Sequence, residues 1–94
     1  MGFGNKYTQT INAEIDLHRL TIKEALEKAA NFLDEAEEKG YQYVRIVTGK
    51  GLHSKEGQPT IKEAVKDWLH NQGYNFRYAK QSQGGEGALV VSIF

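Results

Sequence analysis

The sequence predicts an α/β fold, a two-layer sandwich in which two helices pack on a four-stranded mixed sheet. Two segments place apolar residues every three or four positions, which is typical of amphipathic helices. Four further segments either alternate apolar and polar residues or are apolar throughout, which is typical of strands. The predicted order is βαβαββ, and strands that are joined by helices run parallel in such folds.

The overall composition is that of a small globular protein. Ninety-four residues, of which 39% are hydrophobic and 26% charged, allow one domain with one modest core. Because there is no cysteine, a disulfide framework, a disulfide-linked partner and a thiolate zinc site are excluded, which agrees with a cytoplasmic location. No apolar run approaches the roughly 20 residues of a membrane helix, so we expect no membrane partner.

The chain begins with residues 1–10, which show no periodicity, and we expect a flexible tail followed by a domain over 11–94. Residues 11–17 then alternate, with four apolar side chains opposite Asn12, Glu14 and Asp16. A period of two predicts a strand with one apolar and one polar face. His18 continues the polar row at the end of this strand.

Each predicted helix has a clear beginning and end. Thr21 with Glu24, and Thr60 with Glu63, have the spacing of a capping box, so we expect helices over 21–39 and 60–72. Gly40 and Gly73 then stop them. The outer face of the first helix is acidic, whereas residues 41–55 contain Arg45, Lys50 and Lys55 and no acid.

The remaining strands are expected at 41–47, 74–79 and 88–94, with a turn at 80–87. The last strand follows a short connection and should run antiparallel to at least one neighbour. If the strand order advances steadily, both helices cover one face of the sheet. The polar side chains are left to the other face: Glu14, Asp16, His18, Arg45, Asn75 and Arg77. The predicted core consists of Ile15, Leu17, Leu26, Leu33, Ile46, Val65, Trp68 and Leu69.

The candidate site lies where the first two strands end, because ligands gather at the carboxyl ends of parallel strands. Asp16 and His18 end the first strand, and a carboxylate two residues before a histidine can orient its imidazole for general acid–base work on a phosphate ester. Residues 48–51 (Thr-Gly-Lys-Gly) end the second strand, and their backbone amides and Lys50 could hold the phosphate. His53 follows as a second proton carrier.

Simpler interpretations remain open for each of these features. The glycine loop could be an ordinary strand-to-helix connection, Asp16 could pair with Arg19, and His70 suits a helix end. Residues 48–51 lack the spacing of a nucleotide-binding P-loop. The metal-ligand candidates, Glu14, Asp16, His18 and His53, show no diagnostic spacing, so the need for a divalent metal or any other cofactor is unknown.

Three motifs together resemble the Smr (small MutS-related) domain family, in its stand-alone bacterial form. They are residues 15–18 (Ile-Asp-Leu-His), residues 48–54 (Thr-Gly-Lys-Gly-Leu-His-Ser) and residues 84–88 (Gly-Gly-Glu-Gly-Ala), and the resemblance covers residues 13–94. It implies the same βαβαββ order and a nicking endonuclease on DNA, with RNA cleavage in some relatives. The family's Asp-x-His pair falls on Asp16 and His18. Arg19 stands where the family usually has glycine, so it either changes the turn or adds a cation for phosphate.

Two functions follow as hypotheses, with nucleic acid as the partner in both. The first is an endonuclease that uses Asp16, His18 and His53. The alternative is a non-catalytic module that only binds DNA or RNA. In either case the predicted phosphate contacts are Arg19, Arg45, Thr48, Gly49, Lys50, Gly51, Lys55 and Arg77. A third and more distant hypothesis is a protein-interaction domain that uses the acidic first helix.

Overall fold

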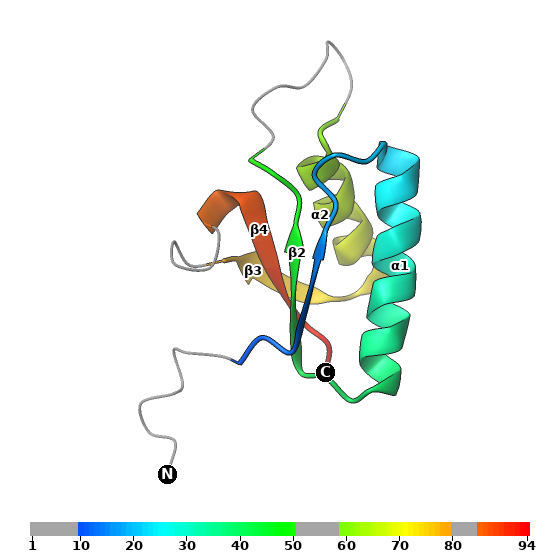
Figure 1. Cartoon of the computed structure of the whole chain (residues 1–94), viewed down its shortest axis with the longest axis vertical. Helices are drawn as coiled ribbons and strands as arrows, with labels where there is room; N and C mark the ends of the chain where they lie inside the picture. Colours follow the sequence, from blue (N-terminus) through cyan, green and yellow to red (C-terminus); the bar gives the residue numbers. More distant parts are fainter. Residues whose placement is uncertain (1–9, 51–58, 80–84) are drawn as a thin grey trace.

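The computed structural model describes residues 10–50, 59–79 and 85–94, and it confirms the predicted α/β sandwich (Figure 1). The elements are β1 (Ala13–Asp16), α1 (Ile22–Glu38), β2 (Tyr43–Val47), α2 (Ile61–Gln72), β3 (Asn75–Tyr78), the short 3-10 helix η3 (Gly85–Gly87) and β4 (Ala88–Ser92). Apart from Thr10, the expected tail lies outside the described residues. The division into a tail and a domain therefore stays a prediction.

The strand order is β1-β2-β4-β3, so β1, β2 and β3 advance in one direction and the last strand is inserted between β2 and β3. β1 and β2 run parallel, and β4 lies between β2 and β3 and is antiparallel to both. The physical reason is the composition of β4, whose first four residues are all buried. A strand that is apolar on both faces gains most from a central position, where it has a neighbour on each side.

Both helices begin where the capping boxes predict. Thr21 accepts a hydrogen bond from the amide of Glu24, and the Glu24 carboxylate accepts one from the amide of Thr21. Thr60 and Glu63 repeat this arrangement at the start of α2. Such caps satisfy amides that have no partner within the helix. No helix in the described ranges is long and apolar enough to cross a membrane.

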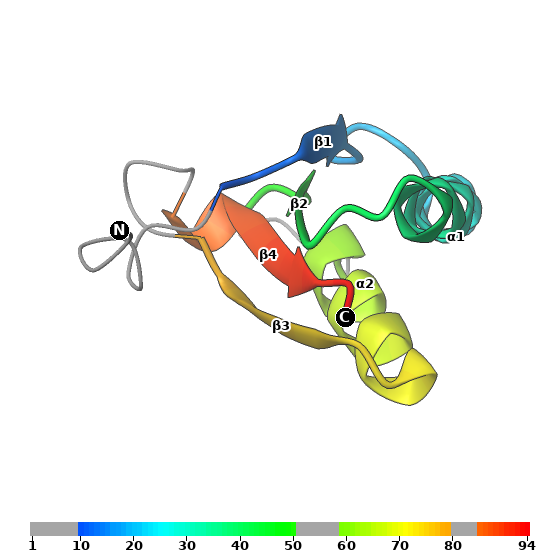
Figure 2. The ribbon, with the colours of Figure 1, turned by 90° about the horizontal axis from the view of Figure 1, so that it is seen from below.

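The two helices cover the same side of the sheet, as predicted, and the core lies between the two layers (Figure 2). Five of the expected core residues are fully buried there: Leu17, Leu33, Ile46, Val65 and Leu69. The other three are partly buried and pack against that core: Ile15, Leu26 and Trp68. This arrangement leaves the opposite side of the sheet without a covering helix.

This opposite side, the uncovered face, carries the polar residues that the alternation predicted, together with a small apolar cluster that it did not. Glu14 and Arg45 lie side by side on β1 and β2 and form an ion pair. Ala79, Ala88 and Val90 are buried on this face. The partly buried side chains of Ile11, Tyr43 and Val47 pack against them. Side chains of β2 and β4, of Ile11 before β1 and of Ala79 after β3 therefore shield part of the sheet that the helices do not cover.

Candidate functional site

The ends of β1 and β2 meet at one edge of the sheet, as the parallel pairing requires. The amide of Leu17 donates to the carbonyl of Val47 at 2.7 Å, which continues the pairing of Asp16 with Val47. Beyond that point Gly49 has a φ of +79°, and a Cβ placed on it would lie 3.4 Å from the Cβ of His18. The glycine loop and the Asp-x-His segment are therefore in contact, as the sequence predicted.

A single carboxylate oxygen fixes His18. β1 ends at Asp16, so His18 lies in the turn that follows, and its amide donates to Asp16 Oδ1 at 3.0 Å. The same oxygen is hydrogen-bonded to His18 Nδ1. Because an ionised carboxylate only accepts, Nδ1 carries the proton and Nε2 keeps its lone pair. The two bonds from His18, ring first and amide second, hold the pKa of Asp16 below its ordinary value of 3.8.

Arg19 adds a cation at this turn, and its φ is not positive. No described residue other than glycine has a positive φ, so the chain accommodates a side chain where the family usually has none. Arg19 Nε donates to His18 Nε2 at 3.1 Å. The imidazole thus lies between a carboxylate on one nitrogen and a guanidinium on the other, and both His18 and Asp16 remain accessible, with 42% and 56% of their side chains exposed.

The glycine motif at residues 84–88 is hydrogen-bonded to the glycine loop at residues 48–51 through Gly87. The amides of Thr48 and Gly49 both donate to the carbonyl of Gly87, at 2.9 and 3.0 Å. The Thr48 hydroxyl donates to the carbonyl of Gly49, and only 4% of Thr48 is exposed. These three donors are already used within the chain, so the predicted phosphate contact through them is not available in this conformation. Their observed contribution is to hold Gly49 against His18.

Among the described residues of the glycine loop, Lys50 is the exposed one. Lys62, in the first turn of α2, donates through Nζ to the carbonyl of Lys50 at 3.4 Å. Lys62 was not predicted as a site residue, although the sequence places it in the first turn of the helix that follows the loop. Gly51, His53 and Lys55 were predicted as site residues and lie outside the described residues.

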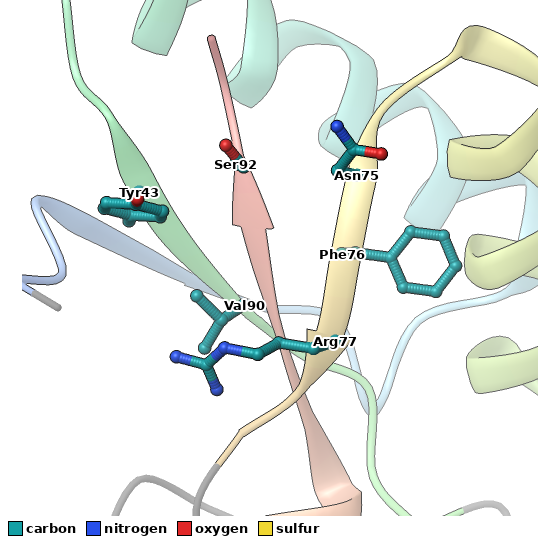
Figure 3. A pocket seen from close by; sticks show the side chains of 6 residues that line it. All are labelled: Tyr43, Asn75, Phe76, Arg77, Val90 and Ser92. Carbon is teal, nitrogen blue, oxygen red and sulfur yellow. The ribbon is translucent and has the colours of Figure 1, made fainter. Parts of the chain in front are cut away.

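Arg45 and Arg77 lie on the uncovered face rather than at the strand ends. Both are level with Val90 in β4, one on each side of it. Arg77 lines a shallow groove of about 240 Å³ whose wall also includes Tyr43 and Ser92 (Figure 3). Glu14 holds Arg45, and the guanidinium of Arg77 donates to the carbonyl of Tyr78 at 3.1 Å. The predicted phosphate ligands therefore divide between two parts of the surface.

A metal site is not evident in the part of the chain that the structure describes. Nowhere in 10–50, 59–79 and 85–94 do three or more histidine, aspartate or glutamate side chains lie so that they could hold a metal ion together. Of the ligand candidates, Glu14 is paired with Arg45, and Asp16 is bonded to His18. Oxygen and nitrogen ligands in greater number are usual for a catalytic metal. The cofactor requirement stays open.

The fold and the site together define a small α/β domain with an Asp-x-His turn held against a glycine loop. The sequence model of the Smr domain matches residues 15–93, and the chain therefore belongs to the Smr domain family, as the three motifs predicted.

Individual relatives agree with this assignment. Endonuclease MutS2 of Clostridium tetani is 31% identical over 87 residues, which is 90% of this chain and 10% of that protein. The Smr domain of Thermus thermophilus MutS2 superimposes with a TM-score of 0.72 at 29% identity, over 85% of this chain and 95% of that one. YdaL of Escherichia coli, a stand-alone small MutS-related protein, has the same fold, with a TM-score of 0.80 at 24% identity over 95% and 71% of the two chains. This chain thus spans about a tenth of the MutS2 relative.

Proposed function

We propose that this Smr domain is an endonuclease that nicks phosphodiester bonds of DNA or RNA, with His18 as the proton carrier. The observation that carries the proposal is the state of the His18 ring. Nδ1 is hydrogen-bonded to Asp16, whereas Nε2 faces away from the carboxylate on an accessible turn. An imidazole held in this way can take a proton from the attacking nucleophile or give one to the leaving oxygen.

The surrounding charges suit a phosphate substrate. Lys50 extends from the loop that touches His18, and the Arg19 guanidinium is already beside Nε2. Lys50 can stabilise the charge that develops on a phosphate in the transition state, and Arg19 can bind the phosphate of the substrate. Asp16 orients the ring and balances the positive charge that the ring acquires when it takes a proton. The name endonuclease of the MutS2 relatives supports the same chemistry, and we expect the protein to act in the cytoplasm.

The test compares His18→Ala with the wild type on two substrates, supercoiled plasmid and a structured RNA. His70→Ala is the matched control, because His70 is the other described histidine and lies exposed in the last turn of α2. We expect His18→Ala to lose most of the cleavage, typically about 10²–10⁴-fold for a general acid or base, with affinity and fold retained. His70→Ala should cleave like the wild type. Parallel reactions with a chelator establish whether a metal is required.

A His18→Ala protein that binds normally and cleaves at the wild-type rate would end the catalytic proposal. In that case the domain is a nucleic-acid-binding module, for which Lys50 and Arg19 suffice. A wild-type protein that binds neither substrate would remove both functions and leave the protein-interaction hypothesis.

A further inference from the structure

Tyr78 at the end of β3 lies between two lysines of α2. The ring is one of the few large apolar side chains that are well exposed in the described part of the chain, at 41%. Lys62 Nζ lies 4.7 Å from the ring centroid and Lys66 Nζ lies 4.9 Å from it. A cation within about 6 Å of an aromatic centroid is attracted by the ring. The tyrosine therefore gathers two ammonium groups at one point of the surface.

These two positive charges have no anion among the described residues. Like charges four residues apart on a helix repel each other, so the pair is unfavourable unless something compensates it. Neither lysine forms an ion pair with a described carboxylate. The nearby Glu63 is used at the start of α2, where it bonds to Thr60. The cluster of Lys62, Lys66 and Tyr78 is thus a concentration of positive charge without an internal partner.

The hydroxyl of Tyr78 is arranged to donate to an anion. Lys66 Nζ donates to this oxygen at 2.9 Å, and an ammonium group cannot accept, so the phenolic hydrogen points elsewhere. The same contact is the main reason why the pKa of Tyr78 lies below its ordinary value of 10.0, with Lys62 adding to the effect. A more acidic hydroxyl is a stronger donor. The cluster offers an anion a hydroxyl and two ammonium groups.

The cluster lies on the same edge of the sheet as His18. β3 and β2 are both antiparallel to β4, so their carboxyl ends lie at the same edge. Tyr78 pairs with Leu89, and Val47 pairs with the adjacent residue Ala88. Lys62 also reaches the carbonyl of Lys50. The glycine loop thus lies against His18 through Gly49 and contacts Lys62 through Lys50, and Lys62 in turn contacts the Tyr78 ring.

We propose that Lys62, Lys66 and Tyr78 form a second phosphate-binding site, which holds the backbone of the bound nucleic-acid strand beside the phosphate that is cleaved at His18. The proposal rests on the proposed function, because it needs a nucleic acid to be the ligand. A phosphodiester suits the cluster, since its oxygens can accept from both lysines and from the tyrosine hydroxyl at once. A contact of this kind positions the strand and reads no base.

The experiment measures the affinity for a fluorescein-labelled single-stranded oligonucleotide, as DNA and as RNA, over a range of salt concentrations. The variants are the double change Lys62→Ala with Lys66→Ala, and Tyr78→Phe, which keeps the ring and removes the hydroxyl. The matched control is Lys28→Ala with Lys39→Ala, which removes the same charge from α1 and its cap and includes another lysine near a tyrosine, 5.9 Å from the Tyr41 ring. Thermal unfolding checks that each variant is folded.

We expect the Lys62 and Lys66 double variant to weaken binding and to flatten the dependence of log K on log salt by roughly 1 to 1.5 units, since each lost contact to a single strand removes about 0.7. Tyr78→Phe should weaken binding less, and the control should change neither quantity.

The second phosphate site would be overturned if the double variant kept the salt slope of the wild type. It would also be overturned if the control lost as much affinity as the double variant. In both cases the proposed function stands. Tight binding of the wild type to poly-glutamate in place of either oligonucleotide would overturn it in favour of an acidic protein partner. Failure of His18→Ala to impair cleavage affects only the catalytic assignment, so the two proposals fail separately.

Discussion

One oxygen of Asp16, Oδ1, accepts both the backbone amide and the ring Nδ1 of His18. The carboxylate therefore fixes the turn that carries the histidine and the orientation of its ring with a single atom. A two-residue separation allows this only because β1 ends at Asp16 and the chain turns at once. The relationship makes Asp16 a positioning residue in the proposed mechanism and leaves His18 Nε2 as the atom that exchanges a proton.

Asp16→Asn tests this division of roles. The amide oxygen of asparagine can still accept from the His18 amide and from Nδ1, so the geometry should survive while the negative charge is lost. We expect a smaller loss of nicking rate than the roughly 10²–10⁴-fold typical of losing a general acid or base. A loss as large as that of His18→Ala, together with inhibition of the wild type by chelator, would instead indicate that Asp16 binds a metal.

Gly49→Ala tests the contact between the loop and His18. Gly49 and Gly40 both have positive φ angles, +79° and +73°, but only at Gly49 would a Cβ meet another residue. Alanine in the left-handed region costs roughly 1–2 kcal/mol, so both variants should lose about that much stability in urea unfolding. Only Gly49→Ala should also lower the nicking rate, because the strained backbone lies where its Cβ would be in van der Waals contact with the Cβ of His18. Equal rates in the two variants would separate the loop from the site.

The alkaline limit of stability should depend on Tyr74. Burial and the hydrogen bond to Glu37 raise the pKa of Tyr74 from 10.0 to about 12. The folded state therefore holds this proton more tightly than the unfolded chain does. Its contribution to stability is complete below pH 10 and is lost as the pH rises through about 12. Tyr74→Phe should be less stable than the wild type at pH 8. Between pH 10 and 12 it should lose less stability than the wild type does. Unfolding can be monitored by the fluorescence of Trp68.

Local features of the sequence predicted local structure well. The capping boxes at Thr21 and Thr60 and the Asp16–His18 pair depend on residues two or three positions apart, and all three are present. The position of β4 between β2 and β3 was not predicted, because it depends on which strands pair in the folded chain. Residues 88–94 are apolar almost throughout, which indicates a buried strand. The same pattern is typical of a strand in the middle of a sheet.

The hydrogen-bond partners of the loop donors were not predicted, for the same reason. The carbonyl that uses the amides of Thr48 and Gly49 belongs to Gly87, far along the chain, and no spacing in the sequence indicates that pairing. Lys66 and Tyr78 meet only because α2 packs beside β3.

Trp68 was expected in the core and is partly buried, so we expect Trp68→Ala to cost less than the roughly 3–5 kcal/mol of a fully buried aromatic.

Lys50→Ala should weaken binding to DNA and RNA about equally across sequences and flatten the salt dependence, because a phosphate contact carries no base information. The slope should fall by about 0.7–0.9, the amount for one phosphate contact. Lys23→Ala on the exposed surface of α1 is the control with the same change in charge. A slope that does not change would remove Lys50 from the phosphate site and leave Arg19 as the described cation that contacts His18.

Arg19 is hydrogen-bonded to the nitrogen of His18 that would exchange a proton. Its Nε donates to His18 Nε2, so this bond must break before that nitrogen can take a proton from a nucleophile. A phosphate at the site can release it, because the guanidinium prefers an anionic oxygen to a neutral nitrogen. We therefore expect Arg19→Ala to raise KM for nicking while kcat stays close to the wild-type value, and Arg19→Lys to recover only part of the affinity, since lysine lacks the planar fork. Steady-state rates over a range of plasmid concentrations separate the two constants. A fall in kcat with KM unchanged would mean that Arg19 acts on the transition state rather than on binding, and an increase in kcat would mean that its bond to Nε2 restrains the enzyme.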